Sequence, residues 1–94
     1  MPATTSLPKH YTPYPELILA GLSGTINYQV AEQIRNRTRF SAFSAWGVSG
    51  KIWWDEKNKN WCAEVSKKTN LLATVTAEAI EDLAFSIQKQ YGWK

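Results

Sequence analysis

The sequence has few of the residues that carry catalysis or hold metal ions. Its 94 residues include one histidine, His10, and one cysteine, Cys62. A single cysteine cannot form an intramolecular disulfide, and this favours a reducing compartment. The sequence contains no nucleophile elbow, zinc-protease motif or glycine-rich phosphate loop, and no His/Cys ligand set for a metal. We therefore expect a protein that is not an enzyme, has no metal site and needs no cofactor.

Long apolar segments are also missing. The longest aliphatic stretch, residues 17–20, is far shorter than the roughly 18 residues that a membrane span needs. The first residues lack the apolar core of a secretory leader. Both absences favour a cytoplasmic protein with no membrane-bound part.

Proline, threonine and serine dominate the N-terminal segment, which holds three of the four prolines. A segment of this composition cannot bury enough apolar surface to offset the entropy lost on ordering. We interpret residues 1–13 as a flexible N-terminal arm. The rest of the chain is richer in apolar residues, which make up 44% of the whole sequence and include five tryptophans. Residues 14–94 are therefore expected to form a single α+β domain.

Two short helices are expected in the first half of this domain. Pro15 suits the first position of a helix over residues 15–22, which Gly24 then interrupts. Thr25 is placed to cap a second helix with an apolar stripe at Ile26, Val30 and Ile34. The pair has the spacing of a helix-turn-helix unit, whose second helix would present basic and amide side chains to DNA. The alternative is an ordinary helical hairpin with solvated arginines.

The second half has the alternation of strands followed by a helix. Segments 49–54, 61–65 and 71–75 are predicted strands, separated by polar turns. Thr76 is a suitable N-cap for a last helix, in which Ile80, Leu83 and Ile87 fall on one face. The predicted order is α-α-β-β-β-α, with a three-stranded antiparallel sheet packed by the C-terminal helix.

Four short motifs in residues 47–92 resemble the β-β-β-α DNA-binding modules of the AP2 and integrase arm-binding type. They are Gly47-Val48, Trp61-x-Ala63-x-Val65, Leu72-Ala73-x-Val75 and Thr76-x-Glu78-x-x-Glu81. The resemblance implies DNA binding from the sheet, where that family uses arginine and tryptophan. The predicted strands here carry lysine instead of arginine, which favours contact with the phosphate backbone over base reading. HicB-type antitoxins and double-stranded-RNA-binding domains share parts of the pattern but match it less well.

The leading hypothesis is a non-enzymatic nucleic-acid-binding protein with an accessory or regulatory role, of the kind that mobile elements encode. A net charge of +3 is compatible with it, although an ordinary globular domain has a similar charge. Trp53 is expected to stack on bases beside Lys51. The predicted phosphate contacts are Arg35, Arg37, Arg39, Lys51, Lys57, Lys59, Lys67 and Lys68.

An alternative hypothesis makes the chain a small inhibitor or adaptor of another protein. It would dock through an aromatic patch around Trp53 or residues 40–43. Ionic strength separates the two hypotheses, since salt weakens phosphate contacts far more than an apolar interface. A third possibility is that the open edge of the sheet pairs with a second copy in a homodimer.

Overall fold

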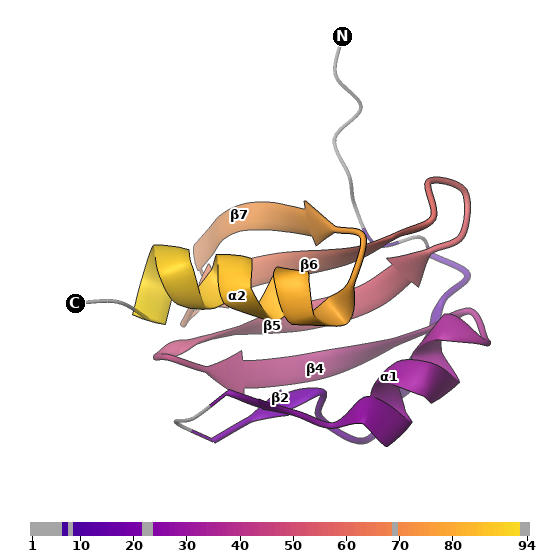
Figure 1. The fold of residues 1–94 in the computed structure, drawn as a ribbon, viewed down its shortest axis with the longest axis horizontal. Helices are drawn as coiled ribbons and strands as arrows, with labels where there is room; N and C mark the ends of the chain where they lie inside the picture. Colours follow the sequence, from indigo (N-terminus) through magenta and orange to yellow (C-terminus); the bar gives the residue numbers. More distant parts are fainter. Residues whose placement is uncertain (1–6, 8, 22–23, 69, 93–94) are drawn as a thin grey trace, which may run out of the picture.

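The structure, a computed structural model, describes residues 7, 9–21, 24–68 and 70–92. A five-stranded mixed sheet, a two-stranded sheet and two α-helices make up the fold (Figure 1). The elements are β1 (Thr12–Tyr14), β2 (Leu19–Ala20), β3 (Thr25–Ile26), α1 (Tyr28–Arg35), β4 (Arg39–Ala45), β5 (Val48–Asp55), β6 (Asn60–Lys67), β7 (Asn70–Ala77), α2 (Ile80–Ile87) and a π-helical turn (Gln88–Gly92).

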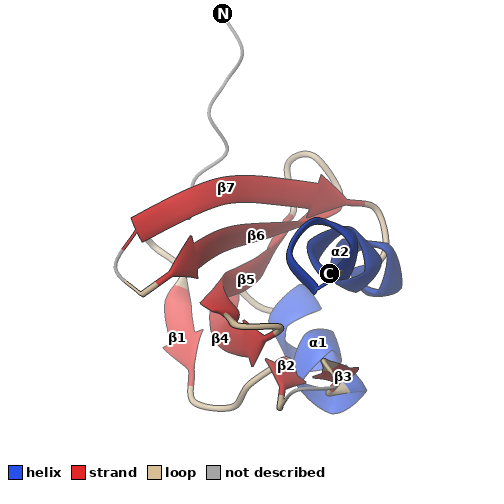
Figure 2. Ribbon diagram, turned by 90° about the vertical axis from the view of Figure 1, so that its left-hand side faces the viewer, coloured by secondary structure: helices blue, strands red, loops and turns tan. Residues whose placement is uncertain are grey.

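The large sheet has the strand order β1-β4-β5-β6-β7. Strands β4 to β7 follow one another as antiparallel hairpins, and β1 is added parallel to β4 at one edge. Both helices lie against the same face of this sheet (Figure 2). We call this the helix face, and the opposite one the open face.

Alternation along β4 shows which face packs against the helices, although Trp53 on β5 and Cys62 on β6 are buried on the opposite face as well. On β4, Phe43 and Ala45 are buried while Ala42 and Ser44 are exposed. The neighbouring strands supply Ile52, Trp54, Trp61, Ala63 and Val65 to the same helix-face core. That core is closed by three residues of α1 and four of α2, which fall at helical spacing: Val30, Ala31, Ile34, Ile80, Leu83, Ala84 and Ile87.

A tight turn joins β4 to β5. Ala45 pairs with Val48, so the loop has two residues, Trp46 and Gly47, and both have positive φ angles, 53° and 78°. This is the geometry of a type I′ hairpin, whose backbone twist matches that of the strands. Asparagine or glycine is usual at the first position, so a tryptophan there is a departure from local preference.

The predicted α-α-β-β-β-α arrangement with a three-stranded antiparallel sheet is wrong. Within residues 15–22, expected to be helical, Leu19 and Ala20 form β2 and pair with Ile26 and Thr25. Thr25 therefore lies in a strand, and Asn27 caps α1 by accepting a hydrogen bond from the Val30 amide at 3.2 Å. A hairpin followed by one helix replaces the expected helix-turn-helix unit.

Two strands of the large sheet were also not predicted. β4 adds Arg39–Ala45 to the sheet, and β1 adds Thr12–Tyr14. Of the predicted arm, residues 1–6 and 8 lie outside the described residues, whereas Thr12 and Pro13 pair with Arg39 and Phe40. Thr76 was predicted to cap the last helix. It lies in β7 instead, and α2 begins four residues later.

Candidate functional site

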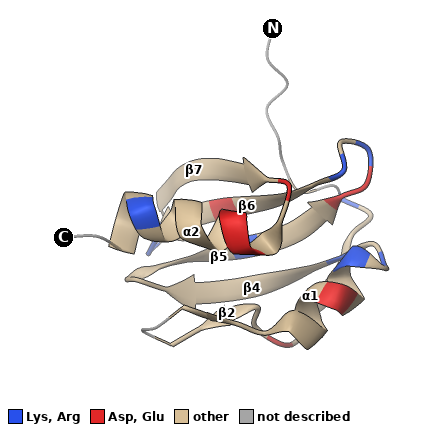
Figure 3. Cartoon of the chain, viewed as in Figure 1, with Lys and Arg blue, Asp and Glu red and all other residues tan. Residues whose placement is uncertain are grey.

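The basic residues singled out from the sequence are divided between the two ends of the sheet. Arg35 and Arg37 end and follow α1, and Lys57 and Lys59 lie in the β5–β6 turn, at the same end (Figure 3). Lys67 and Lys68 lie at the β6–β7 turn. The length of β6, roughly 25 Å at a strand's rise per residue, separates them from the first group. We call Arg35, Arg37, Lys57 and Lys59 the basic end.

Ionic and aromatic contacts tie the basic end together. The Arg35 guanidinium lies over the Trp54 ring, 4.9 Å from its centroid. Glu56 accepts a hydrogen bond from Trp54 Nε1 at 2.8 Å and forms an ion pair with Lys59. Hydrogen bonds from Lys59 and then Trp54 lower the pKa of Glu56, so this carboxylate stays ionised. The contacts join α1 to the β5–β6 turn.

Acidic groups at this end are already engaged within the turn. Asp55 accepts hydrogen bonds from the backbone amides of Lys57 and Asn58, at 3.1 and 3.2 Å. Glu56 is held by Lys59 and Trp54. Among the residues that the structure describes, neither Arg37 nor Lys57 forms an ion pair. These two cations are therefore available to an external anion.

A shallow hollow of about 380 Å³ opens between α1 and the turn. Polar and charged side chains dominate its lining, which consists of Tyr11, Arg35, Asn36, Arg37, Thr38, Trp54 and Glu56. Two guanidinium groups beside an amide and a hydroxyl offer several donors to a phosphate, and arginine suits phosphate because its donors form a planar fork. The donor set of the hollow is suited to a phosphate group.

Trp53 does not have the position that base stacking requires. Its side chain is 1% exposed. It faces the open side of the sheet, opposite Phe40 and Cys62 on the neighbouring strands. Tyr11 lies close by, since its hydroxyl donates to the Trp54 carbonyl at 2.8 Å. The expected stacking role of Trp53 is therefore wrong for this structure.

The aromatic patch of the alternative hypothesis is likewise not on the surface. Phe43 is 1% exposed because it points into the helix-face core. Phe40 is half-buried, and Lys51 Nζ lies 5.5 Å from its ring centroid. With Trp53 also buried, residues 40–53 offer no continuous aromatic surface.

The two remaining predicted cations, Lys51 and Arg39, each lie over an aromatic ring. Lys51 is exposed on the open face, and in the strand register it lies opposite Glu64 of β6. Arg39, at the start of β4, lies over the Tyr14 ring at 5.5 Å. The open face otherwise carries small or uncharged side chains at its exposed and half-buried positions: Ala42, Ser44, Ser49, Thr74 and Thr76. This face has no basic character.

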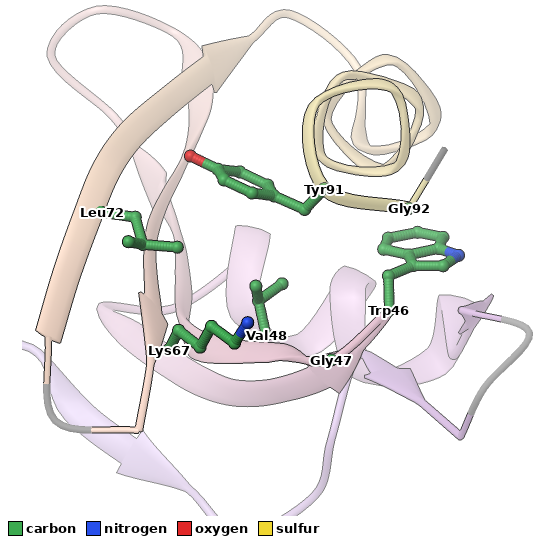
Figure 4. A pocket seen from close by; sticks show the side chains of 7 residues that line it. All are labelled: Trp46, Gly47, Val48, Lys67, Leu72, Tyr91 and Gly92. Carbon is green, nitrogen blue, oxygen red and sulfur yellow. The ribbon is translucent and has the colours of Figure 1, made fainter. Parts of the chain in front are cut away.

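A second hollow, of about 660 Å³, was missed by the sequence reasoning. It lies where the β4–β5 turn and the ends of β6 and β7 meet the C-terminal turn (Figure 4). The residues that line it are Trp46, Gly47, Val48, Lys67, Leu72, Tyr91 and Gly92. One signal was present in the sequence: a tryptophan at a two-residue hairpin turn, where local preference alone would place another residue.

The structure describes no arrangement suited to nucleophilic or metal chemistry. Cys62 has no exposed surface, and burial, with a smaller effect of Asp55, raises the pKa of its thiol to about 12. Across residues 7, 9–21, 24–68 and 70–92, no three His, Cys, Asp or Glu side chains are grouped to hold a metal ion. No helix within these ranges has the length and apolar character to cross a membrane.

Comparisons with protein-family models, with curated proteins and with solved structures found no match to this chain. The resemblance to AP2 and integrase arm-binding modules therefore stays a prediction.

Proposed function

We propose that this chain is a non-enzymatic, cytoplasmic nucleic-acid-binding protein that contacts the phosphate backbone through its basic end. One observation carries the proposal: segments 35–37 and 57–59, far apart in the sequence, bring their cations to the same end of the sheet, where Arg35 and Arg37 line a donor-rich hollow. An accessory or regulatory role fits a small chain that binds without a catalytic constellation.

Binding of this kind depends mainly on charge. Each phosphate neutralised by a lysine or arginine releases condensed counterions, so affinity falls as salt rises. Four cations at the basic end set an upper limit of about 3.6 for the slope of log affinity against log salt on duplex DNA, at about 0.9 per phosphate. Trp53 is buried and adds no base stacking, and because contacts to phosphates carry no sequence information, sequence preference should be weak.

The test is fluorescence anisotropy with labelled duplex DNA, single-stranded DNA and single-stranded RNA at low and moderate salt. The variant Arg37→Glu with Lys57→Glu reverses two exposed charges that the fold does not use in ion pairs among the described residues. It should weaken binding at least about tenfold at low salt, because two phosphate contacts become repulsive.

Lys67→Glu with Lys68→Glu is the matched control, since it makes the same change of net charge at the opposite end. It should reduce affinity much less. If the two variants lose affinity equally, the basic end is not the binding surface. If the unmodified protein binds none of the three nucleic acids at low salt, the proposed function is wrong.

A further inference from the structure

We propose that the hollow beside Trp46 and Tyr91 is a binding site for a small organic carboxylate with an apolar body. This site lies at the other end of β5 from the basic end, because Val48 begins the strand and Asp55 ends it. Its volume, about 660 Å³, is within the roughly 300–1,000 Å³ of small-molecule sites. The inference is independent of nucleic-acid binding.

Apolar and aromatic groups surround the space. The Tyr91 ring extends from the C-terminal turn towards Leu72 on β7, and the Trp46 indole lies beneath Gly92 (Figure 4). Val48 forms the floor between them. A flat or aliphatic ligand body placed here would be desolvated against two aromatic rings and two aliphatic side chains, which is the usual composition of a small-molecule site.

Two polar side chains line the site, and one of them sets its charge preference. The Lys67 side chain runs across the hollow towards Val48, with its ammonium group inside the ring of lining residues (Figure 4). Within the described part of the chain, Lys67 forms no ion pair and the Tyr91 hydroxyl forms no hydrogen bond. No acidic residue lines the hollow. The ammonium is suited to a carboxylate, whereas the Tyr91 hydroxyl points away from Lys67 and can donate to another polar group of the ligand (Figure 4).

The backbone at Trp46 indicates that this wall is fixed before a ligand arrives. Trp46 has a φ angle of 53°, a left-handed conformation that a non-glycine residue keeps only where the surrounding structure holds it. Its ring is held by two glycines: an added Cβ would lie 2.2 Å from the ring at Gly24 and 2.9 Å at Gly92. A preformed wall lowers the ordering cost of binding.

The experiment compares two probes of nearly equal shape, indole-3-acetate and the uncharged indole-3-acetamide, by NMR titration of the full chain. Indole-3-acetate should shift the backbone amides of Gly47, Val48 and Leu72 and the indole N–H of Trp46. It should bind at least about tenfold more tightly than the amide, because only the carboxylate pairs with Lys67.

Lys67→Met keeps the length of the side chain and removes its charge. It should abolish the preference for the carboxylate, whereas Lys68→Met, outside the lining, should leave it unchanged. Equal affinity for the two probes, or a preference that survives in Lys67→Met, would overturn the proposal. Shifts confined to the basic end would also overturn it. Arg37→Glu with Lys57→Glu should bind the probe as the unmodified protein does, so failure of one proposal is distinguishable from failure of the other.

Discussion

The Cys62 thiol faces the open side of β6, opposite Trp53, and has no exposed surface. Burial disfavours the thiolate, so the folded protein holds the thiol proton to a pKa of about 12, whereas the ordinary value is 9.0. Between these two values the unfolded chain has lost this proton and the folded chain has kept it. Stability must therefore fall as pH rises through this window. Below pH 9.0 the thiol is protonated in both states and contributes nothing to the pH dependence of stability.

Urea denaturation of the unmodified protein and of Cys62→Ala, at neutral and at alkaline pH, measures this effect. Above pH 9.0 the unfolding free energy of the unmodified protein should fall relative to that of Cys62→Ala, by at most about 1.4 kcal/mol per pH unit. Tyr11, whose pKa burial also raises, is present in both proteins, and only the smallest cause of its shift, the charge of Cys62, differs between them. Parallel pH profiles would contradict a thiol proton held by burial.

Gly50 lies where a side chain would meet the backbone of the neighbouring strand. A Cβ added there would lie 1.7 Å from the Glu64 carbonyl oxygen, which belongs to the β5–β6 ladder and cannot move without breaking it. Gly50→Ala should therefore cost at least about 3 kcal/mol of unfolding free energy. Gly47→Ala is the control, because nothing lies within 4 Å and only its φ angle of 78° is unfavourable. It should cost about 1 kcal/mol, and equal losses in urea denaturation would refute the steric argument.

The two helices differ in how they begin, and this makes a prediction at the scale of elements. Asn27 caps α1 through its side chain, whereas Ala79, in the same extended conformation at the start of α2, has no side-chain cap. Asn27→Ala should destabilise the protein by about 1 kcal/mol. Ala79→Ser should stabilise it by several tenths of a kcal/mol, up to about 1. Thermal unfolding followed by circular dichroism measures both, and a loss of stability in Ala79→Ser would contradict the assignment of the cap.

The strands and the helix with a clear hydrophobic periodicity were predicted from the sequence. The alternation in segments 49–54, 61–65 and 71–75 correctly predicted β5, β6 and β7, and the spacing of Ile80, Leu83 and Ile87 predicted α2. β4 was missed because its buried positions include the small Ser41 and Ala45, which give a weak alternation. Ser41 is tolerated there because its hydroxyl donates a hydrogen bond to the Glu16 carbonyl, a contact that sequence spacing does not reveal.

Pairing between distant segments could not be predicted in the same way. β1 is three residues long and is a strand only because β4 lies beside it. Leucine has a high helix propensity, yet Leu19 lies in a strand because β2 pairs with β3. The same reason explains the sites: the cations of the basic end were named from the sequence, whereas the grouping of Trp46 with Tyr91 depends on contacts between segments far apart in the chain.

Considered as a whole, the molecule places its two candidate sites at opposite ends of one meander. The basic end includes the turn between β5 and β6. The hollow beside Trp46 and Tyr91 lies at the β4–β5 and β6–β7 turns, at the opposite end of the strands. β7 forms the far edge of the sheet and carries Leu71 and Leu72 exposed, so the homodimer predicted from an open edge stays a prediction of this fold. The opposite edge is occupied by the N-terminal segment.

That N-terminal segment links the edge of the sheet to its open face. Thr12–Tyr14 pairs with β4, and the Tyr11 hydroxyl donates to the Trp54 carbonyl on β5. Burial is the largest cause of the raised pKa of Tyr11, and Asp55, Glu56 and, last, the ionised form of Cys62 add to it. We infer that the segment covers Cys62 and thereby keeps the thiol out of solvent.

Removing residues 1–11 should therefore make Cys62 reactive without unfolding the protein. In the unmodified protein, Ellman's reagent at neutral pH should label the thiol only after denaturant is added, since a buried neutral thiol reacts slowly. The shortened chain, which keeps β1, should be labelled in native buffer at least about tenfold faster if the uncovered thiol is exposed in most molecules. Tyr11→Phe, which loses the hydrogen bond and keeps the ring, is the control and should remain protected. If the shortened chain is folded by circular dichroism and its thiol stays unreactive, the cover over Cys62 comes from the sheet itself, and the N-terminal segment only completes its edge.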